Sequence, residues 1–327
     1  MTSNSAQYEL KKVKFLGREV PIILQNINGP CPLIGIANVL LLRGTIHIST
    51  DYSRISNDEL VAIIAEHIME SNKSIRTSQE MQADLEKNIH DAISILPKMQ
   101  YGLDVNVRFR NPKDFEYTPE CVLFDLVDID LVHGWILDPQ TTNALEEELY
   151  QFISELSYNQ LMEKLIAMSA VLEVQPKPQE NKTLSITQIS VTEEVSNENE
   201  SVSVTTQITE VTSNNDNNQP TKQTSKSPVT PKKHWSDNLD PKVVQTTMNT
   251  FMESNKNMTA EETEKIIKEG QLAEKWLQDT PSQLTFHGIT ELHKTLKDNQ
   301  LCVFFRNNHF ATLFKYKGNL YVLITDS

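Results

Sequence analysis

The chain has 327 residues, a length sufficient for one large domain or two small ones. Acidic residues outnumber basic ones by 44 to 30, which gives a formal net charge of -14. This charge argues against a nucleic-acid-binding protein, because such proteins use lysine and arginine to neutralise phosphates. The three cysteines are widely spaced and cannot all pair, which argues against a disulfide scaffold and against a zinc site of paired cysteines. We therefore expect a protein as the partner, with no metal and no cofactor.

The N-terminal residues contain no apolar signal segment, and no run elsewhere is long enough to span a bilayer. An odd number of cysteines is typical of a protein in a reducing compartment. We expect the protein in the cytosol, with the nucleus as a second location, and we expect no membrane partner.

Residues 8–174 have the mixture of apolar runs and turn signals that is typical of a folded domain. The pattern of residues 13–24 predicts two strands around a turn at Gly17-Arg18-Glu19. These strands lead into an apolar segment from Cys31 to Leu42, which predicts a helix buried on nearly all sides. Strict alternation over Leu103–Phe109 predicts a further strand with one buried and one wet face.

Three more segments of this region carry apolar residues at helical spacing. Asn57–Ser71 begins with Asn57 as the expected N-cap, and Glu80–Leu96 is ended by Pro97. Ser157–Leu172 has the same periodicity. Each of the three segments predicts a helix.

Residues 175–241 consist mainly of Ser, Thr, Asn, Gln, Glu, Lys and Pro, with almost no aromatic residues. Such a composition buries too little apolar surface to offset the entropy of ordering the chain, and it predicts a disordered insert. Two similar alternating segments, Ile189–Val195 and Val204–Val211, allow a repeated polar hairpin as the alternative.

Residues 242–327 return to a globular pattern. Thr259–Leu277, with Thr259 as N-cap, and Pro281–Leu296 predict two helices. Three runs typical of hairpin strands follow, and these are Leu301–Phe305, Phe310–Tyr316 and Leu320–Thr325. The expected fold class is α+β, with a helical first half and an antiparallel sheet at the end of the chain. We expect one domain, out of which the insert loops.

Cys31 is the most informative residue of the sequence. It follows the turn Asn28-Gly29-Pro30 and precedes Pro32, a residue type favoured at the first position of a helix. A thiol at a helix N-terminus lies near the positive end of the helix dipole, which favours the thiolate. Gln25 lies a short distance upstream, and its amide could donate a hydrogen bond to an oxyanion formed beside the sulfur. The pair is typical of a cysteine protease. Cys121 and Cys302 are expected to be core thiols.

A thiolate nucleophile needs a base, which is usually a histidine. His309 is the best candidate because it stands at the start of a predicted strand, after Asn307-Asn308. A histidine on a strand that faces a cysteine at the head of a helix is also the arrangement of papain-like sites. A third group is needed to orient the base, and either Thr325 or Asp326 at the end of the last strand could supply it.

Several colinear segments of both folded regions carry a family resemblance. They are Asn28-Gly29-Pro30-Cys31-Pro32-Leu33, Gly102-Leu103-Asp104-Val105-Asn106-Val107-Arg108-Phe109, Phe115-Glu116-Tyr117-Thr118-Pro119-Glu120-Cys121, His133-Gly134-Trp135, Leu156-Ser157-Tyr158-Asn159-Gln160, Phe304-Phe305-Arg306-Asn307-Asn308-His309-Phe310 and Leu323-Ile324-Thr325-Asp326, together with the strand that leads to Gln25. In these segments the chain resembles the MINDY family of deubiquitinating cysteine proteases.

The resemblance implies a papain-related fold and cleavage of isopeptide bonds in lysine-48-linked polyubiquitin. It assigns Cys31 as nucleophile, His309 as base and Gln25 as oxyanion donor. It also implies that the ubiquitin contacts are Asp104, Val105, Trp135, Tyr158 and Phe305. Because tryptophan and tyrosine bury a large area at small entropic cost, they are suitable contact residues. For Trp135 and Tyr158, packing in the core is the alternative, and the same holds for His133.

Two other functions remain open from the sequence. One is a catalytically inactive protein that binds polyubiquitin chains, although all three of Gln25, Cys31 and His309 are present. The other is a different papain-like cysteine hydrolase, which would act on small substrates. The acidic composition and the candidate aromatic contacts favour a protein substrate.

Overall fold

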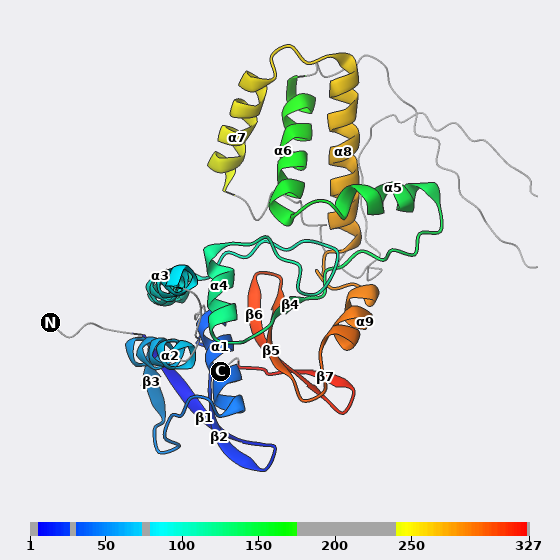
Figure 1. Ribbon diagram of the computed structural model, residues 1–327. Coiled ribbons are helices and arrows are strands. Elements are labelled where there is room, and N and C mark those ends of the chain that lie inside the picture. The colour runs from blue at the N-terminus through cyan, green and yellow to red at the C-terminus, as the bar shows by residue number, and fades with distance from the viewer. Residues whose placement is uncertain (1–5, 27–30, 74–78, 175–239, 326–327) are drawn as a thin grey trace, which may run out of the picture.

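The computed structural model describes residues 6–26, 31–73, 79–174 and 240–325. Within these ranges the chain forms two β-sheets with helices packed around them, which agrees with the α+β class expected from the sequence (Figure 1). The expected disordered insert, including both alternating segments, lies outside the described residues except for its last two positions. There the structure differs from the prediction, because helix α7 (Pro241–Ser254) already begins at Pro241.

The first sheet has the strand order β2-β1-β3 and consists of β1 (Gln7–Phe15), β2 (Arg18–Ile23) and β3 (Arg54–Ser56). The β1–β2 turn is Leu16-Gly17, with φ angles of 46° and 82°, the left-handed pair that suits a two-residue hairpin turn. The turn was expected at Gly17-Arg18-Glu19. Arg18 and Glu19 instead belong to β2, because the tight turn needs only the two preceding residues.

Helix α1 (Cys31–Arg43) is buried along its whole length from Pro32 to Leu42, as the apolar sequence predicts. Asn38 is the polar residue within this run, and its side chain is satisfied by β2. Its Oδ1 accepts from the amide of Ile23 over 2.8 Å, and its Nδ2 donates to the carbonyl of Ile23 over 3.0 Å. These two bonds fix the middle of α1 beside the end of β2.

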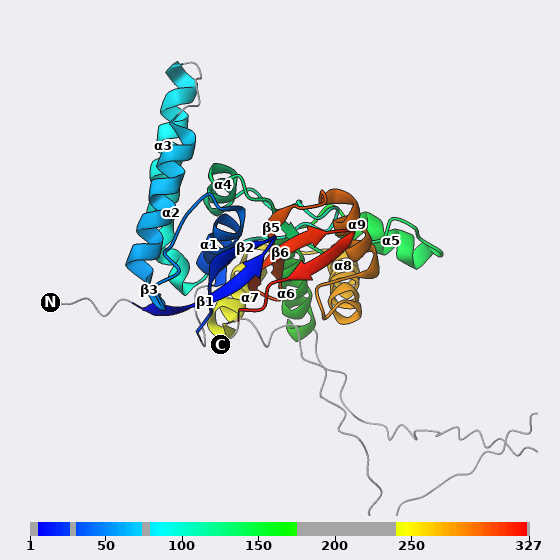
Figure 2. The same cartoon turned by 90° about the horizontal axis from the view of Figure 1, so that it is seen from below.

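Helix α2 (Asn57–Asn72) is capped by Ser56, whose hydroxyl accepts from the amide of Glu59 in a capping box. The expected cap, Asn57, is the first helical residue, and it is buried where Tyr8 donates a hydrogen bond to it. Helix α3 (Gln79–Ile95) gives way to the 3₁₀ helix η1 (Leu96–Tyr101) at the expected Pro97. Figure 2 shows α2 and α3 side by side, projecting from the rest of the molecule.

The strand predicted over Leu103–Phe109 does not form. The segment is extended and makes only isolated bridges, Val107 with Phe115 and Arg108 with Ser157. The alternation fails at Asn106, which was expected on the wet face but is 5% exposed. Its side chain bonds Glu116 and Ser157 and accepts from the amide of Asn159, so the burial of a polar group is compensated by hydrogen bonds.

The helices between and beyond the sheets are α4 (Pro119–Leu126), α5 (Ala144–Ile153), α6 (Tyr158–Val174), α8 (Ala260–Asp279) and α9 (Phe286–Thr295). Helices α6, α7 and α8 pack together on one side of the second sheet (Figure 1). The prediction of α6 is confirmed, and so is Thr259 as the cap of α8. Helix α9 begins later than expected because Thr285 caps it.

The second sheet has the order β4-β5-β6-β7, with β4 (Leu131–His133), β5 (Leu301–Arg306), β6 (His309–Tyr316) and β7 (Asn319–Val322). Strands β5, β6 and β7 are antiparallel, as expected. Strand β4 adds a parallel pairing with β5, which the sequence did not indicate. This pairing joins residues from both sides of the insert in one sheet, and helix α1 packs against β5 and β6.

Candidate active site

Cys31 is the first residue of α1 and is half-buried. The backbone amide of Phe310, the second residue of β6, hydrogen-bonds to its thiol. The contact follows from the packing of α1 on β6, where Thr312 donates to the carbonyl of Gly35 over 3.2 Å. The head of α1 therefore lies against the start of β6.

Burial raises the pKa of the Cys31 thiol above its usual value. Hydrogen bonds from the backbone of Phe310 and of Cys31 itself act in the opposite direction, but the loss of hydration is the larger effect. In this conformation burial therefore opposes the effect expected of the helix N-terminus, and the net direction is a raised pKa of the thiol.

His309 is the first residue of β6, at the end of a two-residue turn. The turn residues Asn307 and Asn308 have φ angles of 52° and 58°, and asparagine tolerates this left-handed conformation better than most residues. The side chain of His309 is exposed, and within the described residues no hydrogen bond or ion pair of the imidazole is found. His309 and the Phe310 contact of Cys31 are thus adjacent in sequence.

Gln25 and Thr325 are joined by a backbone hydrogen bond of 2.8 Å from the amide of Gln25 to the carbonyl of Thr325. Both residues are half-buried. Neighbouring residues position both of them. Near Thr325, the amide of Leu323 donates to the carbonyl of Thr312 on β6, and near Gln25, the amide of Ile23 donates to Asn38 of α1. Asp326, the alternative third group, lies outside the described residues.

The residues implied as ubiquitin contacts differ in exposure. Asp104 is exposed and Val105 and Tyr158 are half-buried, whereas Trp135 is 3% and Phe305 7% exposed. The core packing that the sequence left open for Trp135 is therefore present in this conformation, and Phe305 is buried as well. The indole of Trp135 stacks on Trp276 at 6.2 Å between ring centroids, since the junction of α8 with the β4 segment encloses it.

His133 on β4 is also a core residue. The amide of Trp135 donates to its Nδ1 over 3.2 Å, so the ring proton is on Nε2, which lies 3.3 Å from the carbonyl oxygen of Asp114. Burial lowers the pKa of His133 to about 4, because the charged imidazolium would lose its hydration. His133 is therefore neutral near pH 7 and packs edge-on against Phe115.

The other cysteines do not resemble an active nucleophile. Cys302 is fully buried in β5, and burial raises the pKa of its thiol to about 12. Cys121 is half-buried in α4. Among the described residues, no group of three or more His, Cys, Asp or Glu side chains could hold a metal ion, and no helix is long and apolar enough to cross a membrane.

An apolar pocket of about 390 Å³ lies elsewhere, between the β1–β2 hairpin and strands β6 and β7. It is lined by Phe15, Phe314 and Tyr321, and by Leu42 at the C-terminal end of α1. None of the candidate site residues lines it. The site at the head of α1 and this pocket are therefore separate features.

Sequence reasoning missed two parts of this region. One is Asn106, whose buried side chain hydrogen-bonds to Ser157 and to the amide of Asn159 at the start of α6. The other is the segment between α8 and α9, which contacts the His309 turn. No local pattern marks either of them, because both act through partners distant in sequence.

Comparison with known proteins gives a consistent assignment. The family model described as MINDY deubiquitinase matches residues 6–327. The chain is 34% identical over 319 residues to ubiquitin carboxyl-terminal hydrolase MINDY-1 of Bos taurus, covering 98% of this chain and 48% of that protein. It is 33% identical over 319 residues to MINDY-2 of Mus musculus, covering 98% and 37%, and 32% identical over 319 residues to human MINDY-1, covering 98% and 48%. The chain therefore spans about half or less of the length of these relatives. By the extent of the match, this chain belongs to the MINDY deubiquitinase family.

Proposed function

We propose that the protein is a cysteine-type deubiquitinase that hydrolyses isopeptide bonds in lysine-48-linked polyubiquitin. The observation that carries the proposal is the contact of the Cys31 thiol with the backbone of Phe310, directly after His309, in a chain of this family. The printed names of the relatives, ubiquitin carboxyl-terminal hydrolases, support ubiquitin as the substrate. A papain-related fold is part of the proposal, since it too combines a cysteine at a helix start with a histidine on a strand.

In the proposed reaction, His309 takes the proton of the Cys31 thiol as the sulfur attacks the isopeptide carbonyl. The carbonyl π electrons move to oxygen, and the oxyanion accepts hydrogen bonds from the Gln25 amide and a backbone N–H. Collapse of this intermediate breaks the C–N bond, and His309 protonates the departing lysine amine. Water, deprotonated by His309, then attacks the thioester carbonyl, and release of the ubiquitin carboxylate returns the proton to the thiol.

The resting site is not in its reactive state, and substrate binding has to complete it. Burial raises the pKa of the Cys31 thiol and so disfavours its thiolate, and the exposed imidazole of His309 is not yet hydrogen-bonded within the described part of the chain. Hydrogen bonds of catalytic groups are often long before the substrate is bound. We propose that the bound ubiquitin C-terminus excludes water and brings the imidazole to the thiol, with Thr325 or Asp326 as the orienting group.

The surface proposed for ubiquitin consists of Asp104, Val105 and Tyr158, the accessible members of the implied contact set. Tyr158 is half-buried at the start of α6, and its ring lies 5.8 Å from that of Trp135. Trp135 is buried against the Tyr158 ring, and Phe305 is buried as well. The linkage preference is carried here by family membership, since no single residue specifies it.

The test uses ubiquitin that bears a thiol-reactive electrophile at its C-terminus, with mass spectrometry of the product. We expect one adduct on the wild-type protein, none on Cys31→Ala, and an undiminished adduct on Cys121→Ala as the matched control. No adduct, or an adduct that survives Cys31→Ala, would contradict the proposal. Binding of chains without any adduct would indicate the inactive ubiquitin-binding protein instead. Digestion of chains of defined linkage then tests the lysine-48 preference.

A further inference from the structure

The turn that carries His309 is contacted by the segment between α8 and α9, residues 280–285. The backbone amide of Asn307 donates to Oε1 of Gln283 over 2.9 Å. The Nε atom of Arg306 donates to the carbonyl oxygen of Ser282 over 2.8 Å. The two bonds therefore hold residues that stand three and two positions before His309.

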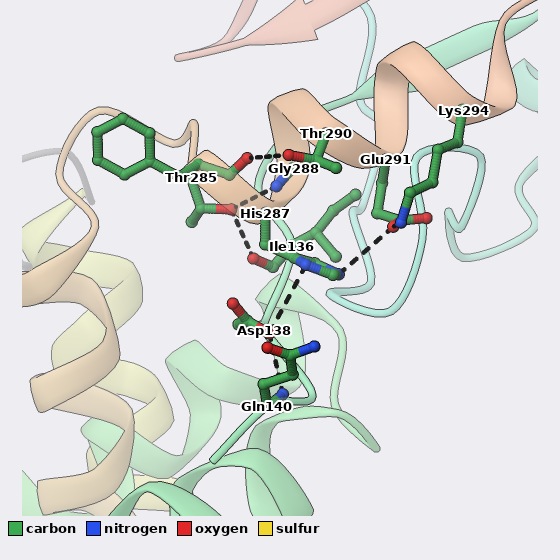
Figure 3. Close-up of polar contacts among 10 residues, drawn as sticks. Ile136, Asp138, Gln140, Thr285, His287, Gly288, Thr290, Glu291 and Lys294 are labelled. Atoms are coloured by element: carbon green, nitrogen blue, oxygen red, sulfur yellow. Dashed lines mark hydrogen bonds and ion pairs between the residues drawn. The ribbon is translucent and has the colours of Figure 1, made fainter. Parts of the chain in front are cut away.

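Segment 280–285 is itself attached at both ends to the residues that follow β4. At one end, the indole nitrogen of Trp135 donates to the hydroxyl of Thr280 over 2.7 Å. At the other, the hydroxyl of Thr285 donates to the carbonyl of Ile136 over 2.7 Å, and the Thr285 amide donates to Gly134 over 3.0 Å. Figure 3 shows the Thr285 side chain beside Ile136. These three hydrogen bonds hold both ends of the segment, Thr280 and Thr285, against the residues that follow β4.

Helix α9 continues this attachment. Gly288 packs so closely on Gly134 that a Cβ on Gly288 would overlap the carbonyl of Gly134. The ring of His287 lies between two carboxylates, 3.7 Å from Asp138 and 3.8 Å from Glu291 (Figure 3). Segment 280–285 therefore cannot shift unless the β4 segment, which lies in the same sheet as β5, shifts with it.

Gln283 adopts a φ angle of 50°, in the left-handed region that residues other than glycine and asparagine rarely occupy. Such a conformation persists only where the surroundings determine it. Here the surroundings are the two attached ends of the segment, and the result is a glutamine side chain that reaches the Asn307 amide.

We propose that Gln283 is a positioning residue for His309. The imidazole is exposed and has no side-chain partner within the described residues, so its place depends on the backbone turn that carries it. By accepting from the Asn307 amide, Gln283 fixes that turn relative to the sheet and to α1. Trp135, buried and bonded to Thr280, acts on the site through the same segment. This inference rests on the proposed role of His309 as the base.

The decisive variant is Gln283→Asn. Asparagine suits the left-handed backbone better than glutamine, but its side chain is one methylene shorter and cannot reach the Asn307 amide. We expect kcat on polyubiquitin to fall between about tenfold and a hundredfold, because a small displacement of a catalytic group is costly. We expect KM and the unfolding midpoint to stay at their wild-type values. A wild-type kcat would overturn the proposal.

The conservative variant Gln283→Glu retains an oxygen that accepts from Asn307, and we expect it to restore most of the activity. Gln278→Asn is the matched control, since Gln278 is an exposed residue on the preceding helix. It should leave kcat unchanged. If Gln283→Asn and Gln283→Glu lose activity equally, and both lower the unfolding midpoint, the role is structural and the proposal is overturned.

A measurement that does not depend on activity separates this inference from the proposed function. Hydrogen–deuterium exchange of the Asn307 amide should be faster in Gln283→Asn than in the wild type, since its acceptor is lost. Unchanged exchange would overturn the inference. A wild-type protein without ubiquitin turnover would instead overturn the proposed function, and faster exchange in the variant would then still identify Gln283 as the residue that holds the turn.

Discussion

Gln25 and Thr325, which stand near opposite ends of the chain, are joined by a hydrogen bond of 2.8 Å from the Gln25 amide to the Thr325 carbonyl. Because both partners are backbone atoms, the bond does not depend on either side chain. Gln25 also stands two residues after the end of β2, which is bonded to α1 through Asn38. The side chain of Gln25 can therefore be changed without releasing the strand end from the site.

Gln25→Glu tests the proposed oxyanion donor. Glutamate has the same size but lacks the amide N–H groups, so the variant should lose about two to three orders of magnitude in kcat, as expected for removal of one oxyanion donor. The unfolding midpoint should change little, because the backbone bond to Thr325 remains. Steady-state turnover of polyubiquitin is the measurement. Wild-type kcat in this variant would assign the oxyanion role to other groups.

The rate at which Cys31 is alkylated should depend on pH as expected for a thiol whose pKa is raised by burial. The thiolate is the reactive form, and burial raises the pKa of Cys31, so alkylation by iodoacetamide should be slow at neutral pH. The rate should still be increasing with pH at about pH 9, the usual value for a thiol. Mass spectrometry of the alkylated protein gives these rates.

His309→Ala is the control for that experiment. In the resting protein it should leave the pH profile of alkylation unchanged, since no bond of the imidazole is found in the described part of the chain. A rate that levels off below about pH 8 in the wild type, but not in this variant, would show a preformed thiolate–imidazolium pair and contradict the resting state described above.

His133 should make the fold sensitive to mild acid. Its pKa is lowered to about 4 from 6.5, so between these values the unfolded chain binds a proton that the folded protein does not. Stability is therefore unaffected above about pH 6.5 and falls as the pH decreases towards 4. From the shift, we expect a loss of about 2 kcal/mol in the free energy of unfolding between about pH 7 and about pH 5.

Urea denaturation of the wild type and of His133→Gln at both pH values measures this effect. The variant has no imidazole to protonate, so the difference in free energy of unfolding between the two proteins should change by the same amount. Equal pH dependence in the two proteins would contradict the assignment of His133 as a buried neutral group.

Trp135→Ala should destabilise the fold strongly. The indole is buried between Phe109 and Trp276 and donates to Thr280, so its removal leaves a cavity and takes away one hydrogen bond. We expect a loss of about 3–5 kcal/mol in the free energy of unfolding, measured with urea. Asp104→Ala, at an exposed position of the same implied contact set, should leave stability unchanged. A fully stable Trp135→Ala variant would mean that the indole is a surface contact after all.

Several elements were predictable because their signals are local. The apolar run from Cys31 to Leu42 indicated a buried helix, and the runs Leu301–Phe305 and Phe310–Tyr316 indicated two strands of a hairpin. Both predictions depend on residues within one helix or one hairpin. The caps show the limit, since Ser56 rather than Asn57 is the N-cap of α2, and neighbouring polar residues compete for that position.

Other elements depended on distant partners. Leu103–Phe109 has the alternation of a strand, but Asn106 finds buried hydrogen-bond partners in residues far along the chain, so the strand gives way to an extended segment. Helix α7 was missed because its sequence is mostly polar. It is stabilised where Met248 packs against Ile166 and Ala170 of α6.

The sequence by itself determined the kind of site, because the residue types Gln25, Cys31 and His309 and their order are properties of the chain, and so is the family to which it belongs. The tertiary structure decided the state of that site. Burial of Cys31 against β6, the enclosure of Trp135, and the attachment of the His309 turn to Gln283 all arise from packing between segments distant in sequence. Desolvation and hydrogen-bond partners depend on such neighbours, so only the fold shows that burial raises the pKa of Cys31 and that a remote glutamine bonds the turn before His309.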